Sequence, residues 1–424
     1  MKGLAALAAR SAWHRRGTLA LVVLSIALAT LLLLSQERLR QDVRASFVDA
    51  VSGTDLIVGA RSAPVQLLLY AVFRIGGATS NMRMDSVRAL AALRGVAWVV
   101  PLSLGDSHRG LPVLGTTPEY FARFRYGDAQ PLALARGRAF AGTLDGLYEA
   151  VIGAEVAARL GYATGQRITL SHGAGGLPGT EHADKPFLVV GILAATGTPV
   201  DRTVHISLQA IEAVHLGWAG GAPLPGLRLQ PEAARKFDLE PKQVTAALVG
   251  LQTRSAVFAV QRQVNAFEAE PLMAVLPGVA LDELWQLVGL GERALLAMSA
   301  LVAVVSLAGL VATVLAGLNE RRRELAVLRA LGAGPRHVLL LLAAEGTILT
   351  LLGALLGAVA AAVALWLTAP WVQSQLGLTL RGGAPTAVQW GLWAAVVGAG
   401  ILASLVPGLR AYRLSLADGL SPRV

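Results

Sequence analysis

The chain has 424 residues, of which 54% are hydrophobic and only 15% are charged. Soluble domains usually carry about a quarter charged residues, so this composition argues against a soluble protein and for a membrane protein. The formal net charge is +10, and the chain contains no cysteine, which excludes a disulfide framework and thiol chemistry.

Four apolar runs are candidates for membrane-spanning helices, because such helices need about 20 mostly apolar residues. They cover residues 17–35, 294–318, 338–367 and 390–406. The buried helices of a soluble protein seldom run so far without a polar face. The first run is followed by SQERLRQDVR rather than by a small-residue cleavage site, so we expect a retained anchor and not a signal peptide.

Basic residues concentrate in three segments, residues 1–16, 319–337 and 407–424. The positive-inside rule places all three in the cytoplasm. With four spans, residues 36–293 then form one large extracytoplasmic domain, and residues 368–389 form a short loop on the same side. The positive charge is explained by membrane topology, and we expect no nucleic-acid partner.

The chain enters and leaves the extracytoplasmic domain through two helical patterns. Apolar residues recur at helical spacing after the first span and again before the second span, which places each set on one face of a helix. We therefore expect a stiff stalk continuous with the first two spans; the alternative is a pair of amphipathic helices on the membrane or domain surface. The stalk positions are Leu39, Val43, Phe47, Val51, Leu281, Leu284, Trp285 and Val288.

The domain between these patterns alternates β-like runs with helical patterns, which predicts a mixed α/β (α+β) domain. A Gly-rich segment at 172–182 indicates a loop, and a Gly- and Pro-rich segment at 220–236 is expected to divide the domain into an early and a late lobe. Strands are expected at 55–60, 96–102, 111–115, 167–171, 187–193 and 245–251, and helices at 86–95, 154–161 and 255–267.

The chain carries no recognisable catalytic motif. The patterns G-x-x-x-x-G-K-[ST], H-E-x-x-H and G-x-S-x-G are all absent, so we expect no enzyme and no ATP hydrolysis by this chain. His172, His182 and Asp184 lie close together in sequence, and His205 and His215 follow. Zinc needs three or four ligands that converge at about 2 Å. The irregular spacing favours hydrogen-bonded or solvated histidines, and a metal site remains the alternative.

Three features of the apolar segments have two interpretations each. Glu345 lies near the cytoplasmic end of the third span, and an ionisable group at membrane depth is a functional candidate; we favour a structural role, by snorkelling or by pairing with a basic loop residue. Gly353 and Gly357 allow close approach of another helix, from the same subunit or from a second copy. The apolar run 67–73 is interpreted as core rather than as a lipid-facing surface.

The segment NERRRELAVLRALGAGPRHV, residues 319–338, lies between the second and third spans. Its leucines fall on one side of a short helix, LGAG provides a helix end, and Pro335 prevents continuation. A plain positive-inside anchor would need only scattered arginines, so the alternation of acidic and basic residues favours a surface for a protein partner.

This segment resembles the signature of the FtsX/MacB-type ABC transporter permeases, in which it docks on a partner ATPase. GTTPEYF (115–121), YEAVIGAEVAARLG (148–161) and the run 187–208 resemble the MacB-type periplasmic core domain. The runs 53–76 and 274–289 resemble the branch near lipoprotein-release and DevC-like permeases. The resemblance covers nearly the whole chain.

The resemblance implies a type VII ABC system in the bacterial inner membrane, with four transmembrane helices and a MacB-like periplasmic core domain on helical stalks. An ABC ATPase dimer would bind ATP, so this chain needs no cofactor, and a second permease copy, identical or different, would complete the membrane part. The motion of the ATPases would pass through the stalks to the periplasmic domain, a process called mechanotransmission. The docking surface would comprise Glu320, Arg321, Arg322, Arg323, Glu324, Leu325, Leu328, Arg329, Ala330, Leu331, Gly332 and Ala333.

The resemblance leaves the substrate open: a lipoprotein, a lipid, a peptide or a small amphiphile of the envelope. Membrane lipid is an expected contact, and a periplasmic adaptor, a lipoprotein or an outer-membrane component are further candidate partners. The alternative function is that of an FtsX-like regulator, which transmits ATPase motion to a periplasmic partner without moving a substrate.

Overall fold

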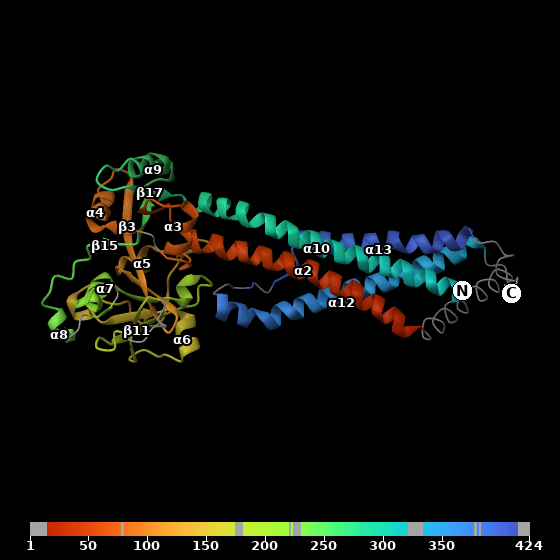
Figure 1. Ribbon diagram of the computed structural model, residues 1–424, viewed down its shortest axis with the longest axis horizontal. Helices are drawn as coiled ribbons and strands as arrows, with labels where there is room; N and C mark the ends of the chain where they lie inside the picture. Colours follow the sequence, from red (N-terminus) through yellow and green to blue (C-terminus); the bar gives the residue numbers. More distant parts are fainter. Residues whose placement is uncertain are drawn as a thin grey trace. The chain divides into compact units, whose positions relative to one another are not determined.

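The computed structural model describes residues 15–77, 80–173, 181–219, 222–223, 230–320, 334–376, 380 and 383–413. The chain separates into two compact units. The helical unit contains residues 1–42, 289–371 and 380–424, and the α/β unit contains residues 43–288 and 372–379. Both are drawn in Figure 1.

Four long helices carry the four predicted apolar runs: α2 (Arg16–Val51), α10 (Pro277–Glu320), α12 (Pro335–Leu376) and α13 (Ala387–Arg413). Each is long and apolar enough to cross a membrane. Many large apolar side chains of these helices are exposed, among them Leu290 (77%) and Leu402 (68%). Such exposure suits a hydrocarbon environment rather than water, so the predicted four-helix membrane part is confirmed.

The two glycines of the third span pack α12 against α2. A Cβ atom added at Gly353 would lie 2.8 Å from the Cβ of Ile26, and one added at Gly357 would lie 2.4 Å from the carbonyl oxygen of Ala27. Small residues let helix backbones approach this closely in membranes. Of the two interpretations that the sequence allowed, the structure shows packing within one subunit.

The α/β unit is built on an 11-stranded sheet with the order β17-β1-β16-β3-β4-β12-β8-β11-β7, to which β10 adds on β3 and β9 adds on β11. The sheet is mostly antiparallel; the pairs β11–β8 and β12–β4 are parallel. Its strands are β1 (Leu56–Ala60), β3 (Val96–His108), β4 (Leu111–Thr116), β7 (Leu134–Gly137), β8 (Glu149–Ile152), β9 (Arg167–Ile168), β10 (Ser171–His172), β11 (Phe187–Leu193), β12 (Val204–Ser207), β16 (Ala246–Leu251) and β17 (Leu272–Val275).

Short helices and two-residue strands surround this sheet, and with it they confirm the predicted mixed α/β domain. The helices are α3 (Pro64–Ala71), α4 (Met84–Ala91), α5 (Glu119–Arg123), α6 (Ala154–Leu160), α7 (Leu208–His215), α8 (Pro231–Ala234) and α9 (Val257–Asn265), with 3-10 turns η1 (Leu144–Gly146), η2 (Pro199–Arg202) and η3 (Arg254–Ala256). The remaining strands are β2 (Met82–Arg83), β5 (Arg125–Tyr126), β6 (Gln130–Pro131), β13 (Trp218–Ala219), β14 (Ala222–Pro223) and β15 (Gln243–Val244).

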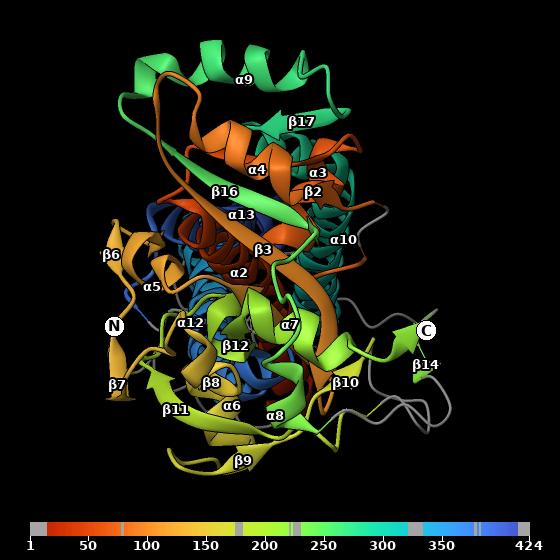
Figure 2. The same ribbon diagram turned by 90° about the vertical axis from the view of Figure 1, so that its left-hand side faces the viewer.

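The long strand β3 runs through the unit and joins two packed regions (Figure 2). Its first half pairs with β16, and its second half pairs with β4 and β10. The first strand of the domain, β1, pairs with the late strands β16 and β17. The predicted division into an early and a late lobe near 220–236 is therefore wrong, because the two ends of the domain share one sheet.

Candidate functional site

The segment with the most specific sequence signal lies outside the described residues. Helix α10 ends at Glu320, and α12 begins at Pro335. The docking residues from Arg321 to Ala333 fall between these helices. Their assignment as an ATPase-docking surface stays a prediction.

The membrane-embedded Glu345 has a basic partner. Its carboxylate lies 3.1 Å from a guanidinium nitrogen of Arg15, and the two side chains are only 17% and 18% exposed. Burying an ion pair is costly unless the geometry is good, and removing one partner leaves an unpaired charge. Arg15 comes from the segment before α2 and not from the 319–337 loop, so this ion pair links α12 to the start of the first span.

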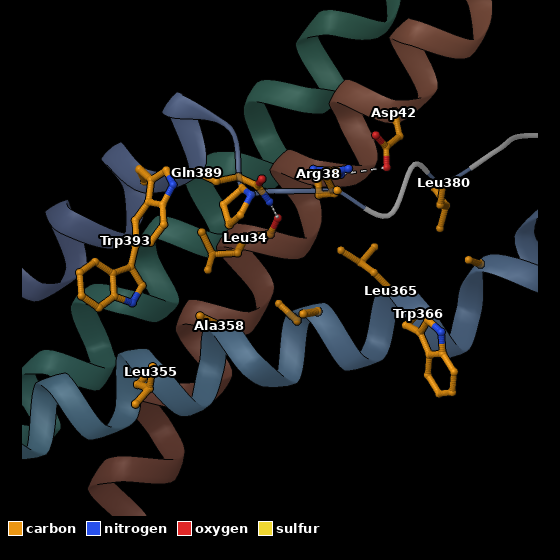
Figure 3. Close-up of a pocket in the computed structure, with 16 residues that line it drawn as sticks. Leu34, Arg38, Asp42, Leu355, Ala358, Leu365, Trp366, Leu380, Gln389 and Trp393 are labelled. Atoms are coloured by element: carbon orange, nitrogen blue, oxygen red, sulfur yellow. Dashed lines mark hydrogen bonds and ion pairs between the residues drawn. The ribbon is translucent and has the colours of Figure 1, made fainter.

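A cavity of about 570 Å³ lies within the helical unit, between α2, α12 and α13 (Figure 3). Its walls are largely apolar. Its lining residues are Leu34, Arg38, Asp42, Leu355, Ala358, Ala361, Ala362, Leu365, Trp366, Ala369, Leu380, Gly383, Pro385, Gln389, Trp390 and Trp393. No local pattern in the sequence predicts this cavity, because its lining residues come from separate segments of the chain.

Polar groups gather at one end of this cavity. The Arg38 guanidinium lies 3.1 Å from Asp42 and donates a 3.3 Å hydrogen bond to the carbonyl of Ala384. Gln389 donates to the carbonyl of Leu34 at 3.3 Å. The charged pair lies 22 residues or more beyond the basic start of α2, which places it toward the extracytoplasmic side by the positive-inside rule. The cavity thus combines largely apolar walls with a polar end.

Several of the predicted stalk positions are packed in the core of the α/β unit. The ring of Phe47 stacks on Phe73 at 4.2 Å and meets Trp285 edge-on at 5.4 Å. Val51 and Leu281 are buried in the same core. Leu284 is partly buried there, whereas Leu39 and Val288 are exposed. The run 67–73 contributes Leu67, Leu68, Ala71, Val72 and Phe73 to this core, as the core interpretation predicted.

The structure gathers some of the sequence-flagged histidines and separates others. His172 and His182 meet His215 and Asp106, and one ligand atom from each of the four lies within 4.8 Å of the others. Asp184 is not a member; its carboxylate lies 3.6 Å from Lys185 Nζ. His205 lies fully buried elsewhere, beside Tyr120. Burial lowers the pKa of His205 to about 3, which keeps it neutral.

The comparisons with known proteins agree with this architecture. A family model of the MacB-like periplasmic core domain matches residues 17–267, and a model of the FtsX-like permease C-terminal region matches residues 296–416. No curated protein sequence matches the chain.

Two solved structures are similar to about half of this chain. The periplasmic region of MacB from Actinobacillus actinomycetemcomitans is 10% identical, with a TM-score of 0.35, over 56% of this chain and 97% of that one. The extracellular domain of the noncanonic ABC-type transporter YknZ from Gram-positive bacteria is 12% identical, with a TM-score of 0.30, over 52% of this chain and 98% of that one. On the family models, which together span both units, the chain belongs to the FtsX/MacB-type permeases of ABC transporters.

Proposed function

We propose that this chain is the permease subunit that couples ATP hydrolysis by a separate ATPase to the handling of an amphiphilic substrate of the bacterial envelope, at the inner membrane. The family implies an ABC ATPase partner and a dimeric arrangement in general. The proposal adds the route of the coupling and the class of substrate.

The coupling route rests on the helices that connect the two ends of the protein. Helix α2 runs unbroken for 36 residues and α10 for 44, and the boundary between the two units falls inside each helix. A continuous α-helix resists bending because each residue adds a backbone hydrogen bond. A movement imposed on residues 319–337 would therefore pass along α10, and its end is anchored in the α/β core by Trp285.

The substrate class rests on the cavity of the helical unit. The apolar walls suit an acyl chain, and the polar end at Arg38 and Asp42 suits a headgroup or a lipidated terminus. Pockets with apolar walls and few polar groups bind ligands of this type. This observation favours the transporter over an FtsX-like regulator, which needs no site for a substrate.

The test uses the complete permease–ATPase complex, purified in mild detergent from native membranes and placed in nanodiscs. Diacylated lipopeptide and lysophospholipid are the probes, and the readout is ATPase stimulation. Ala358→Trp places an indole at the cavity wall and narrows the cavity. Val359→Trp is the matched control, because the neighbouring Val359 is exposed and does not line it.

We expect a probe to stimulate the wild type and the Val359→Trp variant, and Ala358→Trp to keep basal ATPase activity without stimulation. Stimulation retained in Ala358→Trp would exclude the cavity as the substrate site. A stable complex that no amphiphile stimulates would favour the regulator. A chain that copurifies with no ATPase would refute the coupling itself.

A further inference from the structure

Three histidines and one aspartate converge in the α/β unit from four segments of the chain. Asp106 lies on β3, and His172 lies directly opposite it on β10, since the two are cross-strand partners. His182 lies ten residues beyond His172 in the sequence, and His215 ends α7. Strand pairing and the end of one helix therefore fix the group, although its members are up to 109 residues apart in sequence (215 minus 106).

The distances among these groups are short. His172 Nδ1 lies 3.0 Å from His215 Nε2 and 3.2 Å from Asp106 Oδ1, and His215 Nε2 lies 3.4 Å from the same oxygen. A tetrahedral cation with metal–nitrogen bonds of about 2.0–2.1 Å holds its ligand atoms about 3.3 Å apart. The three distances bracket this value, and a ring nitrogen of His182 lies within 4.8 Å of the other three ligand atoms.

Two of the four side chains lack the partners that buried polar groups normally have. His182 is fully buried, and neither of its ring nitrogens has a hydrogen-bond partner among the described residues. The buried Oδ2 of Asp106 also has none within the described part of the chain. Buried polar atoms without partners are rare and costly, so each calls for an explanation such as an ion.

His215 is already oriented as a ligand. Its Nδ1 lies 2.8 Å from the carbonyl oxygen of Ile211 and donates a hydrogen bond to it. In the neutral ring the lone pair is then on Nε2, which lies among the cluster atoms, 3.0 Å from His172 Nδ1 and 3.4 Å from Asp106 Oδ1. Metal-ligating histidines almost always hold their second nitrogen in this way. The ring of Trp218 packs 4.3 Å from that of His182 and covers the group with an apolar side chain.

We propose that Asp106, His172, His182 and His215 bind a divalent first-row transition cation, with Zn²⁺ as the reference ion. Imidazole nitrogens and a carboxylate oxygen suit such ions, whereas Ca²⁺ and Mg²⁺ prefer oxygen ligands alone. Four protein ligands complete a tetrahedron and leave no open position, which is the arrangement of structural zinc sites. The ion would fasten β10, the residues after 181 and the end of α7 to β3.

The test uses the full-length chain in detergent, with any polyhistidine tag cleaved and bound metal removed by a chelator. Zinc content is measured after addition of Zn²⁺ and gel filtration, and Co²⁺ is titrated while visible absorption is recorded. The variants are His182→Gln, His215→Gln and the near-isosteric Asp106→Asn. His108→Gln is the matched control, because His108 lies on the same strand and contacts Thr169 and Tyr162 instead.

We expect the wild type and His108→Gln to bind one equivalent of Zn²⁺ and to give the intense absorption of tetrahedral Co²⁺. Each ligand variant should lose at least ~100-fold in affinity, because changes to second-shell groups alone cost 10–100-fold. A wild-type chain that binds no zinc, or that gives only weak octahedral Co²⁺ absorption, would overturn the proposal whether or not any variant folds. Equal zinc binding by the wild type and the three ligand variants would overturn it as well.

Discussion

The contact between α12 and α2 predicts that two glycine-to-alanine substitutions change the stability of the chain in opposite directions. Alanine is more favourable than glycine inside a helix by about 0.8–1.0 kcal/mol. At Gly398 on α13 an added Cβ meets nothing within 4 Å, so Gly398→Ala should stabilise the chain by up to that amount. At Gly357 the added Cβ would lie 2.4 Å from the carbonyl oxygen of Ala27 and 2.6 Å from the Cβ of Thr30.

Neither of the atoms facing Gly357 is the end of a flexible side chain, so the helices themselves must separate. Overpacking of this kind costs about 1–3 kcal/mol, which outweighs the gain in helix propensity. We expect Gly357→Ala to lower the apparent melting temperature in detergent and Gly398→Ala to leave it unchanged or raise it. The assay is the fraction of monodisperse protein after heating, followed by size-exclusion chromatography. Destabilisation of equal size by both substitutions would refute the assignment of Gly357 to a tight helix contact.

Three further predictions concern the coupling parts. A flexible Gly-Ser insertion after Phe47 should abolish substrate-stimulated ATPase activity without loss of assembly. The same insertion after the exposed Asp128 should leave the stimulated activity intact. Stimulation that persists after the Phe47 insertion would contradict a stiff stalk. Glu345→Gln should lower the free energy of unfolding by about 1–3 kcal/mol, because Arg15 then keeps a poorly exposed charge without this carboxylate. Exchanging the two residues (Arg15→Glu with Glu345→Arg) should restore part of the lost stability. Unchanged stability in both variants would show that the ion pair does not stabilise the fold. Asp42→Asn should alter the preference among amphiphile headgroups and leave basal ATPase activity intact, which ATPase titrations with anionic and zwitterionic probes would measure.

The architecture was accessible from the sequence because hydrophobic length and charge position are local signals. All four apolar runs are helices, and the predicted strand 187–193 is strand β11 as expected. The predicted strand 96–102 was too short. Strand β3 continues beyond Leu102 to His108 through a more polar stretch, because its second half pairs with a different set of strands. The two-lobe division failed for a related reason, since strand partners are chosen by non-local packing.

The sites depended still more on non-local geometry. Asp106 carries no local signal of a metal ligand, and only its pairing with His172 brings it to the other histidines. The Arg15 partner of Glu345 is 330 residues away, and the cavity combines three helices. By contrast, the helical spacing around Phe47 and Trp285 is visible in the sequence, because one helical face is a local property, and the two rings are in contact. Their role in a stalk stays a prediction.

The most direct measurement follows the motion itself. Since the chain has no cysteine, a single nitroxide label can be placed by Leu287→Cys on α10, at a side chain that is 70% exposed. Electron paramagnetic resonance spectra of the permease–ATPase complex are then compared without nucleotide and with ATP trapped by vanadate. We expect the spectrum to change on trapping, and the charge-reversed loop variant Glu324→Lys with Arg329→Glu to keep the nucleotide-free spectrum. Identical spectra in both states of an active wild-type complex would contradict transmission along α10.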